Sequence, residues 1–157
     1  MAQFDKAIEK VLVNEGGYVN DPNDRGGETN YGISKRSYPN VDIKNLTVAG
    51  AKEIYKRDYW DRLRADEINS QQIAFELFDT AVNMGVRTSS KLAQMVAGSY
   101  PDGIIGNKTL EKINTIDVEL FVSKFKLAKI ARYVYLAKKR PANRKFLFGW
   151  VNRALGA

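Results

Sequence analysis

The stretch Glu15-Gly16-Gly17-Tyr18 ends an amphipathic segment, and it is followed at once by Asp21-Pro22-Asn23-Asp24-Arg25-Gly26-Gly27-Glu28-Thr29-Asn30-Tyr31-Gly32-Ile33. Upstream, apolar residues recur at helical spacing, namely Phe4, Ile8, Val11 and Leu12. This spacing predicts a helix over roughly residues 3–14. The paired glycines stop that helix, and the run rich in glycine, proline and asparagine predicts turns or a small hairpin. A helix that leads directly into a folded-back loop is therefore the first fixed part of the fold.

Glu15 lies at the carboxyl end of the predicted helix. The helix dipole and the unpaired carbonyl groups there disfavour a negative charge, and nearby apolar side chains add a desolvation effect of the same sign. Both effects favour a carboxyl group that stays protonated near neutral pH. Such a group can act as the general acid that protonates a leaving oxygen in glycosidic-bond cleavage.

The loop supplies two more polar groups. Eight residues separate Glu15 from Asp24, and four separate Asp24 from Thr29. If the loop folds back across the helix end, a second carboxylate and a hydroxyl group face Glu15 across a cleft. One acid, one carboxylate and one group that holds water are the equipment for hydrolysing a sugar linkage.

The order Glu15, Asp24, Thr29 resembles the one found in phage-type lysozymes. The whole stretch from Glu15 to Ile33 is similar to the glycoside hydrolase 108 muramidases. Between Asp24 and Thr29 the chain has one residue fewer than phage-type lysozymes usually have. The resemblance covers nearly the whole chain, since it continues through Tyr59-Trp60, Phe78-Asp79-Thr80-Ala81-Val82-Asn83-Met84-Gly85, Asp102-Gly103-Ile104-Ile105-Gly106-Asn107-Lys108-Thr109-Leu110 and Phe148-Gly149-Trp150.

The resemblance implies a mainly α, lysozyme-like helical fold with a small hairpin or loop region near residues 18–35. It implies an enzyme that cleaves the glycan strand of peptidoglycan. We expect a single compact domain over residues 1–157, in which 1–88 form a catalytic lobe and 89–157 form a helical, basic, peptidoglycan-binding-like lobe. A chain of 157 residues and 17.7 kDa suits one domain with one core.

The composition excludes several other chemistries. The chain has no histidine and no cysteine. Ser-His-Asp and Cys-His nucleophile systems are therefore excluded, as are the histidine and cysteine ligands of hydrolytic zinc sites. A zinc amidase or a cysteine peptidase is ruled out. This elimination favours an enzyme that cleaves glycan with carboxylate side chains. The sequence implies no metal and no organic cofactor.

The remaining segments predict helices with ordinary start and stop signals. Thr47 and Ser70 are expected to cap two core helices, the second of which ends at Gly85. Further helices are expected over about residues 89–97, from a cap at Asn107 through 113, and from Asp117 to about 139. The longest of these should carry Phe121, Phe125, Ala128 and Tyr135 on one side. A last helix is expected after Pro141, and no strand outside the loop hairpin is expected.

One polar residue and several aromatic residues are candidates for contact with sugar. Asn83 lies four residues after Asp79, on the same helix face, and could contact an acetamido group; these two residues could equally bond to the helix end. Tyr18, Tyr31 and Trp60 have rings that could stack on a sugar, although an aromatic side chain can also simply belong to the core. Tyr31 is the strongest candidate because it lies inside the loop.

The amino terminus does not show a basic segment followed by an apolar one, so we expect no standard signal peptide and synthesis in the cytoplasm. No apolar run is long enough to predict a transmembrane segment. An enzyme that attacks the cell wall or acts in the periplasm would then need release by another protein. A holin-type pore beside a phage or prophage endolysin would serve, as would a secretion system that delivers an effector. We expect a monomer.

Charge is unevenly distributed along the chain. The segment 120–157 holds ten basic residues and no acidic one, whereas residues 1–119 hold fifteen basic and eighteen acidic residues. A basic carboxyl-terminal segment is attracted to polyanions such as wall polymers, lipid head groups or nucleic acid, and it can also be only a solvated face. No reading helix or RNA-binding motif accompanies the charge, so no specific nucleic acid is expected.

Two classes of function stay open. The first is an N-acetylmuramidase, a lysozyme-type glycoside hydrolase, in which Glu15 protonates the β-1,4 glycosidic oxygen between N-acetylmuramic acid and N-acetylglucosamine. Asp24 would stabilise the positive charge or activate water, and Thr29 would help to position that water. The same Glu15 could instead serve a lytic transglycosylase, in which the muramic 6-hydroxyl replaces water. The second class is a non-catalytic module that binds cell wall or nucleic acid.

Overall fold

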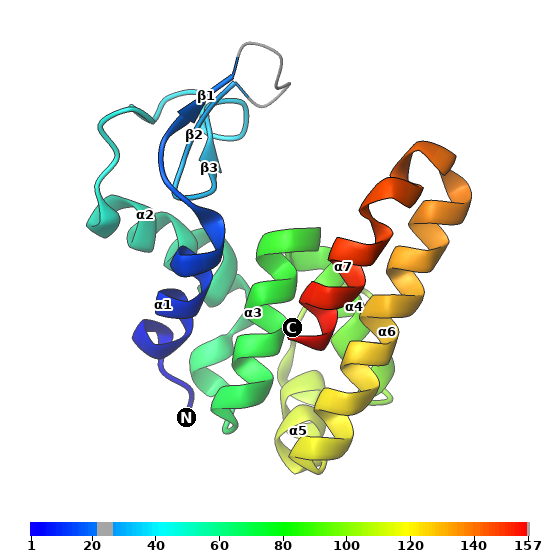
Figure 1. Cartoon of the computed structure of the whole chain (residues 1–157). Helices are drawn as coiled ribbons and strands as arrows, with labels where there is room; N and C mark the ends of the chain where they lie inside the picture. Colours follow the sequence, from blue (N-terminus) through cyan, green and yellow to red (C-terminus); the bar gives the residue numbers. More distant parts are fainter. Residues whose placement is uncertain (22–26, 157) are drawn as a thin grey trace.

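The computed structural model describes residues 1–21 and 27–156, and it is mainly α-helical with one small sheet (Figure 1). The described residues form seven α-helices: α1 Phe4–Glu15, α2 Val48–Tyr55, α3 Gln71–Met84, α4 Val86–Val96, α5 Asn107–Thr115, α6 Val118–Lys139 and α7 Leu147–Leu155. They also form three short strands: β1 Val19–Asn20, β2 Glu28–Asn30 and β3 Ile33–Ser34. The predicted fold class, a lysozyme-like helical fold with a small hairpin near residues 18–35, is confirmed.

The sheet is antiparallel in the order β1-β2-β3 and lies beyond the carboxyl end of α1 (Figure 1). Thr29 in β2 pairs with Val19 on one side and with Ser34 on the other. A turn of two residues, Tyr31 and Gly32, joins β2 to β3, with φ angles of 51° and 76°. Positive φ at both central residues is typical of the tight turns that match the twist of a hairpin.

Helix α3 lies at the centre of the molecule, in contact with α1 on one side and with α4 and α6 on the other (Figure 1). The Ser70 hydroxyl caps it by accepting a hydrogen bond from the Ile73 amide at 3.3 Å. Its Phe78 ring meets those of Trp60 and Phe4 edge-on, at centroid distances of 5.5 and 5.9 Å. Because α3 belongs to both sides of the core, its carboxyl half can present side chains to α1 and to α7 alike.

Most predicted helix boundaries agree with the structure. Thr47 and Asp117 cap α2 and α6 as expected. Asn107 is the first residue of α5 rather than its cap, which is Gly106. Helix α4 begins at Val86, directly after Gly85, and so starts earlier than expected. None of the helices that the structure describes is long and apolar enough to cross a membrane.

Two local features differ from expectation. Tyr135 was expected beside Phe121 and Phe125, but it is 52% exposed. The buried stripe of α6 continues from Phe125 in steps of four residues, through Lys129, Tyr133 and Ala137, and this turns Tyr135 to solvent. After α2 the chain forms a π-helical turn over Lys56–Trp60, and the Trp60 side chain is fully buried in the core, so it is not available to stack on a sugar.

Candidate active site

Glu15 is the last residue of α1, and Gly16 ends the helix with a positive φ of 68°. The Glu15 side chain is 21% exposed, so its carboxyl group is partly withdrawn from water and still reachable. Its position follows from the local sequence, because the apolar stripe of α1 packs on the core up to Val11 and the glycine then stops the helix.

The tip of the β2–β3 hairpin packs against Glu15. A Cβ atom at Gly32 would lie 2.8 Å from Glu15 Oε2 and 2.6 Å from the Tyr55 hydroxyl oxygen. Glycine is therefore required here by the close approach as well as by the positive φ. The Tyr55 hydroxyl donates a hydrogen bond to the carbonyl oxygen of Tyr31 at 2.7 Å, which ties the turn to α2. Burial, followed by the nearby charge of Glu15, raises the pKa of Tyr55, so this hydroxyl stays protonated as a donor.

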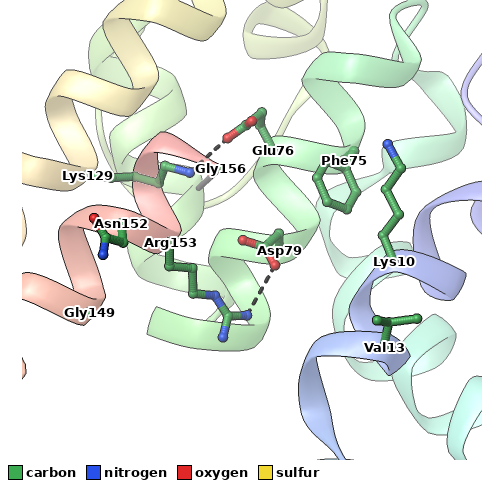
Figure 2. A pocket seen from close by; sticks show the side chains of 10 residues that line it. All are labelled: Lys10, Val13, Phe75, Glu76, Asp79, Lys129, Gly149, Asn152, Arg153 and Gly156. Atoms are coloured by element: carbon green, nitrogen blue, oxygen red, sulfur yellow. Dashed lines mark hydrogen bonds and ion pairs between the residues drawn. The ribbon is translucent and has the colours of Figure 1, made fainter.

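A cation from the far end of the chain reaches the same carboxyl group. Arg153 of α7 donates from Nη2 to Glu15 Oε1 at 3.2 Å and to Asp79 Oδ1 of α3 at 3.1 Å. Figure 2 shows Arg153 extending from α7 toward Asp79. Burial alone would lower the pKa of Arg153, but the charges of Asp79 and Glu15 and the hydrogen bonds to them raise it above its usual value. The arrangement is a three-member charge cluster drawn from three helices.

A pocket of about 720 Å³ lies beside this cluster, between α1, α3, α6 and α7 (Figure 2). Lys129, whose side chain is only 4% exposed, donates there to Glu76 Oε2 at 2.8 Å. The pocket is lined by Lys10, Val13, Phe75, Glu76, Asp79, Lys129, Gly149, Asn152, Arg153 and Gly156. Its walls therefore carry both signs of charge around the Arg153 side chain.

A second, smaller pocket of about 260 Å³ lies at the end of α3. The Asn83 side-chain amide donates to the Tyr133 hydroxyl, and the rings of Tyr133 and Trp150 stack with their centroids 5.2 Å apart. Arg132 and Thr88 also line this pocket. Because Asn83 follows Asp79 by about one helical turn, and Trp150 precedes Arg153 by a similar step, the pocket lies close to the Arg153 cluster.

The structure brings some of the predicted site residues together. Glu15 and the Tyr31–Gly32 turn are in contact, and Thr29 lies in β2 two residues before that turn. Asp24 lies outside the described residues. The Tyr18 hydroxyl, just before β1, donates to Glu28 Oε1 of β2 at 3.1 Å. Among the described residues, no group of three or more acidic side chains is placed to hold a metal ion.

Three residues beside Glu15 were not found by sequence reasoning as members of the site. In the sequence, Tyr55 lies in the core helix expected after Thr47 and carries no further signal, and Asp79 is marked only as a neighbour of Asn83 on one helix face. Arg153 was one basic residue among ten in the carboxyl-terminal segment, with no local pattern to distinguish it. The helical spacing of Asp79 and Asn83 was a usable signal, since it marked one face of α3 as polar near the helix end.

Two family models match the chain, one in each half. Residues 8–85 match glycosyl hydrolase 108, and residues 82–155 match a predicted peptidoglycan domain. Among solved structures, one described as the structure of Brucella abortus SagA is 28% identical, with a TM-score of 0.73; the match covers 98% of this chain and 94% of that chain. No curated protein matches. These matches place the protein among glycoside hydrolases that act on peptidoglycan. The chain belongs to the glycosyl hydrolase 108 family and carries a peptidoglycan domain in its carboxyl-terminal half.

Proposed function

We propose that this protein is an N-acetylmuramidase in which Glu15 is the general acid. The observation that carries the proposal is the position of Glu15: a partly buried carboxyl group at the end of α1, in contact with the hairpin tip and inside the glycosyl hydrolase 108 region. A carboxyl group at such a place can donate a proton to the glycosidic oxygen between N-acetylmuramic acid and N-acetylglucosamine.

The other catalytic roles are proposed from the sequence. Asp24 would stabilise the positive charge that develops on the sugar or would activate water, and Thr29 would help to position that water. The position of Thr29 in β2, close to the turn that contacts Glu15, supports this role. From the sequence we also propose that residues 1–88 form a catalytic lobe and that residues 89–157 form a wall-binding lobe.

Three side chains are proposed to contact the glycan: Tyr18, Tyr31 and Asn83. Tyr31 has a φ of 51°, a backbone conformation that costs free energy in a residue with a side chain and is often found at functional sites. Asn83 lies in the small pocket beside the partly buried Trp150, where an amide and an aromatic face could receive an N-acetylated sugar. Tyr18 is 41% exposed beside the hairpin.

The decisive experiment compares purified wild-type protein with Glu15→Gln on peptidoglycan sacculi, with identification of the released fragments by mass spectrometry after borohydride reduction. We expect reduced muramic-acid ends from the wild type and none from Glu15→Gln, because glutamine cannot donate the proton. The variant should melt like the wild type. Glu9→Gln is the matched control, since Glu9 is an exposed carboxylate of the same helix.

Each other outcome removes part of the proposal. Products lighter by one water, with 1,6-anhydro ends, would assign the protein as a lytic transglycosylase. Full activity of folded Glu15→Gln would exclude Glu15 as the acid. A wild-type protein that binds sacculi and releases no fragment would leave only a binding module. If the proposal holds, a holin-type pore or a secretion system is the expected route of such an enzyme to the wall.

A further inference from the structure

The contact between Glu15 and Arg153 crosses the border between the two family regions. Glu15 belongs to the region 8–85, and Arg153 belongs to the region 82–155. The two residues are 138 positions apart in sequence, yet Arg153 Nη2 lies 3.2 Å from Glu15 Oε1. A domain that only anchors an enzyme to the cell wall does not require a contact with the carboxyl group of the proposed acid.

We propose that Arg153 is a positioning residue for Glu15, and that the carboxyl-terminal peptidoglycan domain is thereby part of the active site. The inference rests on the proposed role of Glu15 as the acid. Arg153 is itself held in place, because the same Nη2 also donates to Asp79 Oδ1 at 3.1 Å, and the Asp79 side chain is only 12% exposed. The guanidinium group fixes the direction of the Glu15 carboxyl group from the α7 side, while the Tyr31–Gly32 turn confines it from the sheet side.

The charges of this cluster suit proton donation. When Glu15 gives its proton to the glycosidic oxygen, it becomes a carboxylate, and the positive charge of Arg153 stabilises that product of the transfer. Asp79, which accepts a hydrogen bond from the same Arg153 nitrogen, offsets part of this positive charge. Among the described residues, the ionisable groups of other helices that interact with Glu15 include Tyr55 of α2 and Arg153 of α7, and Asp79 of α3 pairs with the same Arg153 nitrogen.

Arg153 also holds unused hydrogen-bonding capacity. Its buried Nε has no hydrogen-bond partner in the part of the chain that the structure describes. The side chain lines the larger pocket, and a buried donor of this kind calls for a water molecule or a substrate group. A lysine at this position would keep the charge and would lose the planar set of donors.

The first test measures glycan release and sacculus binding separately for Arg153→Gln, Arg153→Lys and a control. Arg144→Gln is the control because it removes one exposed positive charge from the same domain. We expect Arg153→Gln to lower the rate of fragment release about tenfold to a hundredfold, as the loss of a charge-assisted hydrogen bond implies. Binding to sacculi should stay within about twofold, and Arg153→Lys should restore part of the rate. Arg144→Gln should match the wild type.

The second test uses the alkaline limb of the pH–rate profile, where the acid loses its proton. Arg153→Gln removes a positive charge beside Glu15, so the limb should move to higher pH. Asp79→Asn removes a negative charge and leaves Arg153 in place, so the limb should move to lower pH. A purely structural role would not move the limb in opposite directions. If Arg153→Gln does not fold, the test rests on the alkaline limb of Asp79→Asn, and an unchanged limb in that variant would overturn the proposal.

The two proposals fail in distinguishable ways. A folded Arg153→Gln with the wild-type rate and the wild-type pH profile, beside an inactive Glu15→Gln, would overturn the role of Arg153 and keep Glu15 as the acid. A loss of sacculus binding equal to the loss of rate would also overturn it, because Arg153 would then serve anchoring alone. An active Glu15→Gln would remove the proposed function itself.

Discussion

At the scale of single residues, Gly32 shows how the site depends on an absent side chain. The residue has a φ of 76°, and its Cα faces both the Glu15 carboxyl group and the Tyr55 hydroxyl. The hairpin tip can approach the end of α1 this closely only because glycine has no Cβ. Tyr31, immediately before it, also has a positive φ, so backbone strain and the acidic group occur at the same place.

We expect Gly32→Ala to lower both stability and activity. The left-handed backbone alone should cost about 1 to 2 kcal/mol. The new methyl group would also push against Glu15 Oε2 at 2.8 Å and the Tyr55 hydroxyl at 2.6 Å, and would move the acid. Urea denaturation and fragment release from sacculi measure the two effects. Gly17→Ala is the control, because a Cβ there meets nothing within 4 Å. Equal behaviour of the two variants would contradict the close approach.

At the scale of elements, α3 joins the two halves of the molecule through its charged side chains. Glu76 binds Lys129 of α6, and Asp79 binds Arg153 of α7. The Lys129 ammonium group is almost fully withdrawn from water, and Lys126 lies 3.8 Å from the other Glu76 oxygen. These contacts fix the carboxyl-terminal helices relative to α3, and thus hold α7 where Arg153 can reach Glu15.

We expect Glu76→Gln to destabilise the fold by about 3 kcal/mol, because it leaves the buried Lys129 without its opposite charge. The change in the free energy of unfolding can be measured by urea denaturation. Glu111→Gln, at an exposed position of α5, is the matched control and should change stability little. A Glu76→Gln variant as stable as this control would show that the ion pair does not contribute to the joint between α3 and α6.

At the scale of the whole molecule, the uneven charge of the sequence has two separate roles. Lys126, Lys129 and Arg153 face inward and meet acidic residues that lie far earlier in the chain. Other basic residues, such as Lys138, Lys139 and Arg140, are exposed at the end of α6. Only this second group is free to attract an anionic partner over a distance.

We expect replacement of Lys138, Lys139 and Arg140 by glutamine to weaken binding to sacculi at low salt. The difference from the wild type should disappear as salt rises to about 0.3 M, because exposed charges are screened over a shorter distance there. Pelleting of sacculi with bound protein at several salt concentrations measures the effect. The rate of release per bound molecule should not change. A difference that persists at high salt would mean that these residues make direct contacts.

Much of the secondary structure was predictable because its signals are local. The caps at Thr47, Ser70 and Asp117 follow from side chains that bond to amides three residues away. The boundary errors at Asn107 and Val86 are small, and they arose where glycine directly precedes a helix. The prediction for Tyr135 is wrong because the buried face of α6 passes through Tyr133, and a residue two positions further along a helix lies on a different face.

Sequence alone therefore determined a mainly helical fold, the end of α1 at Glu15 and the hairpin that follows, since each depends on backbone preferences over a few residues. Only the tertiary structure decided that Arg153 and Asp79 stand beside Glu15 and that Tyr55 and Gly32 close the other side. The physical reason is that these contacts depend on how the faces of α1, α3 and α7 pack together. Neither a periodic pattern nor a charge count specifies which of the ten basic residues in segment 120–157 meets which carboxylate.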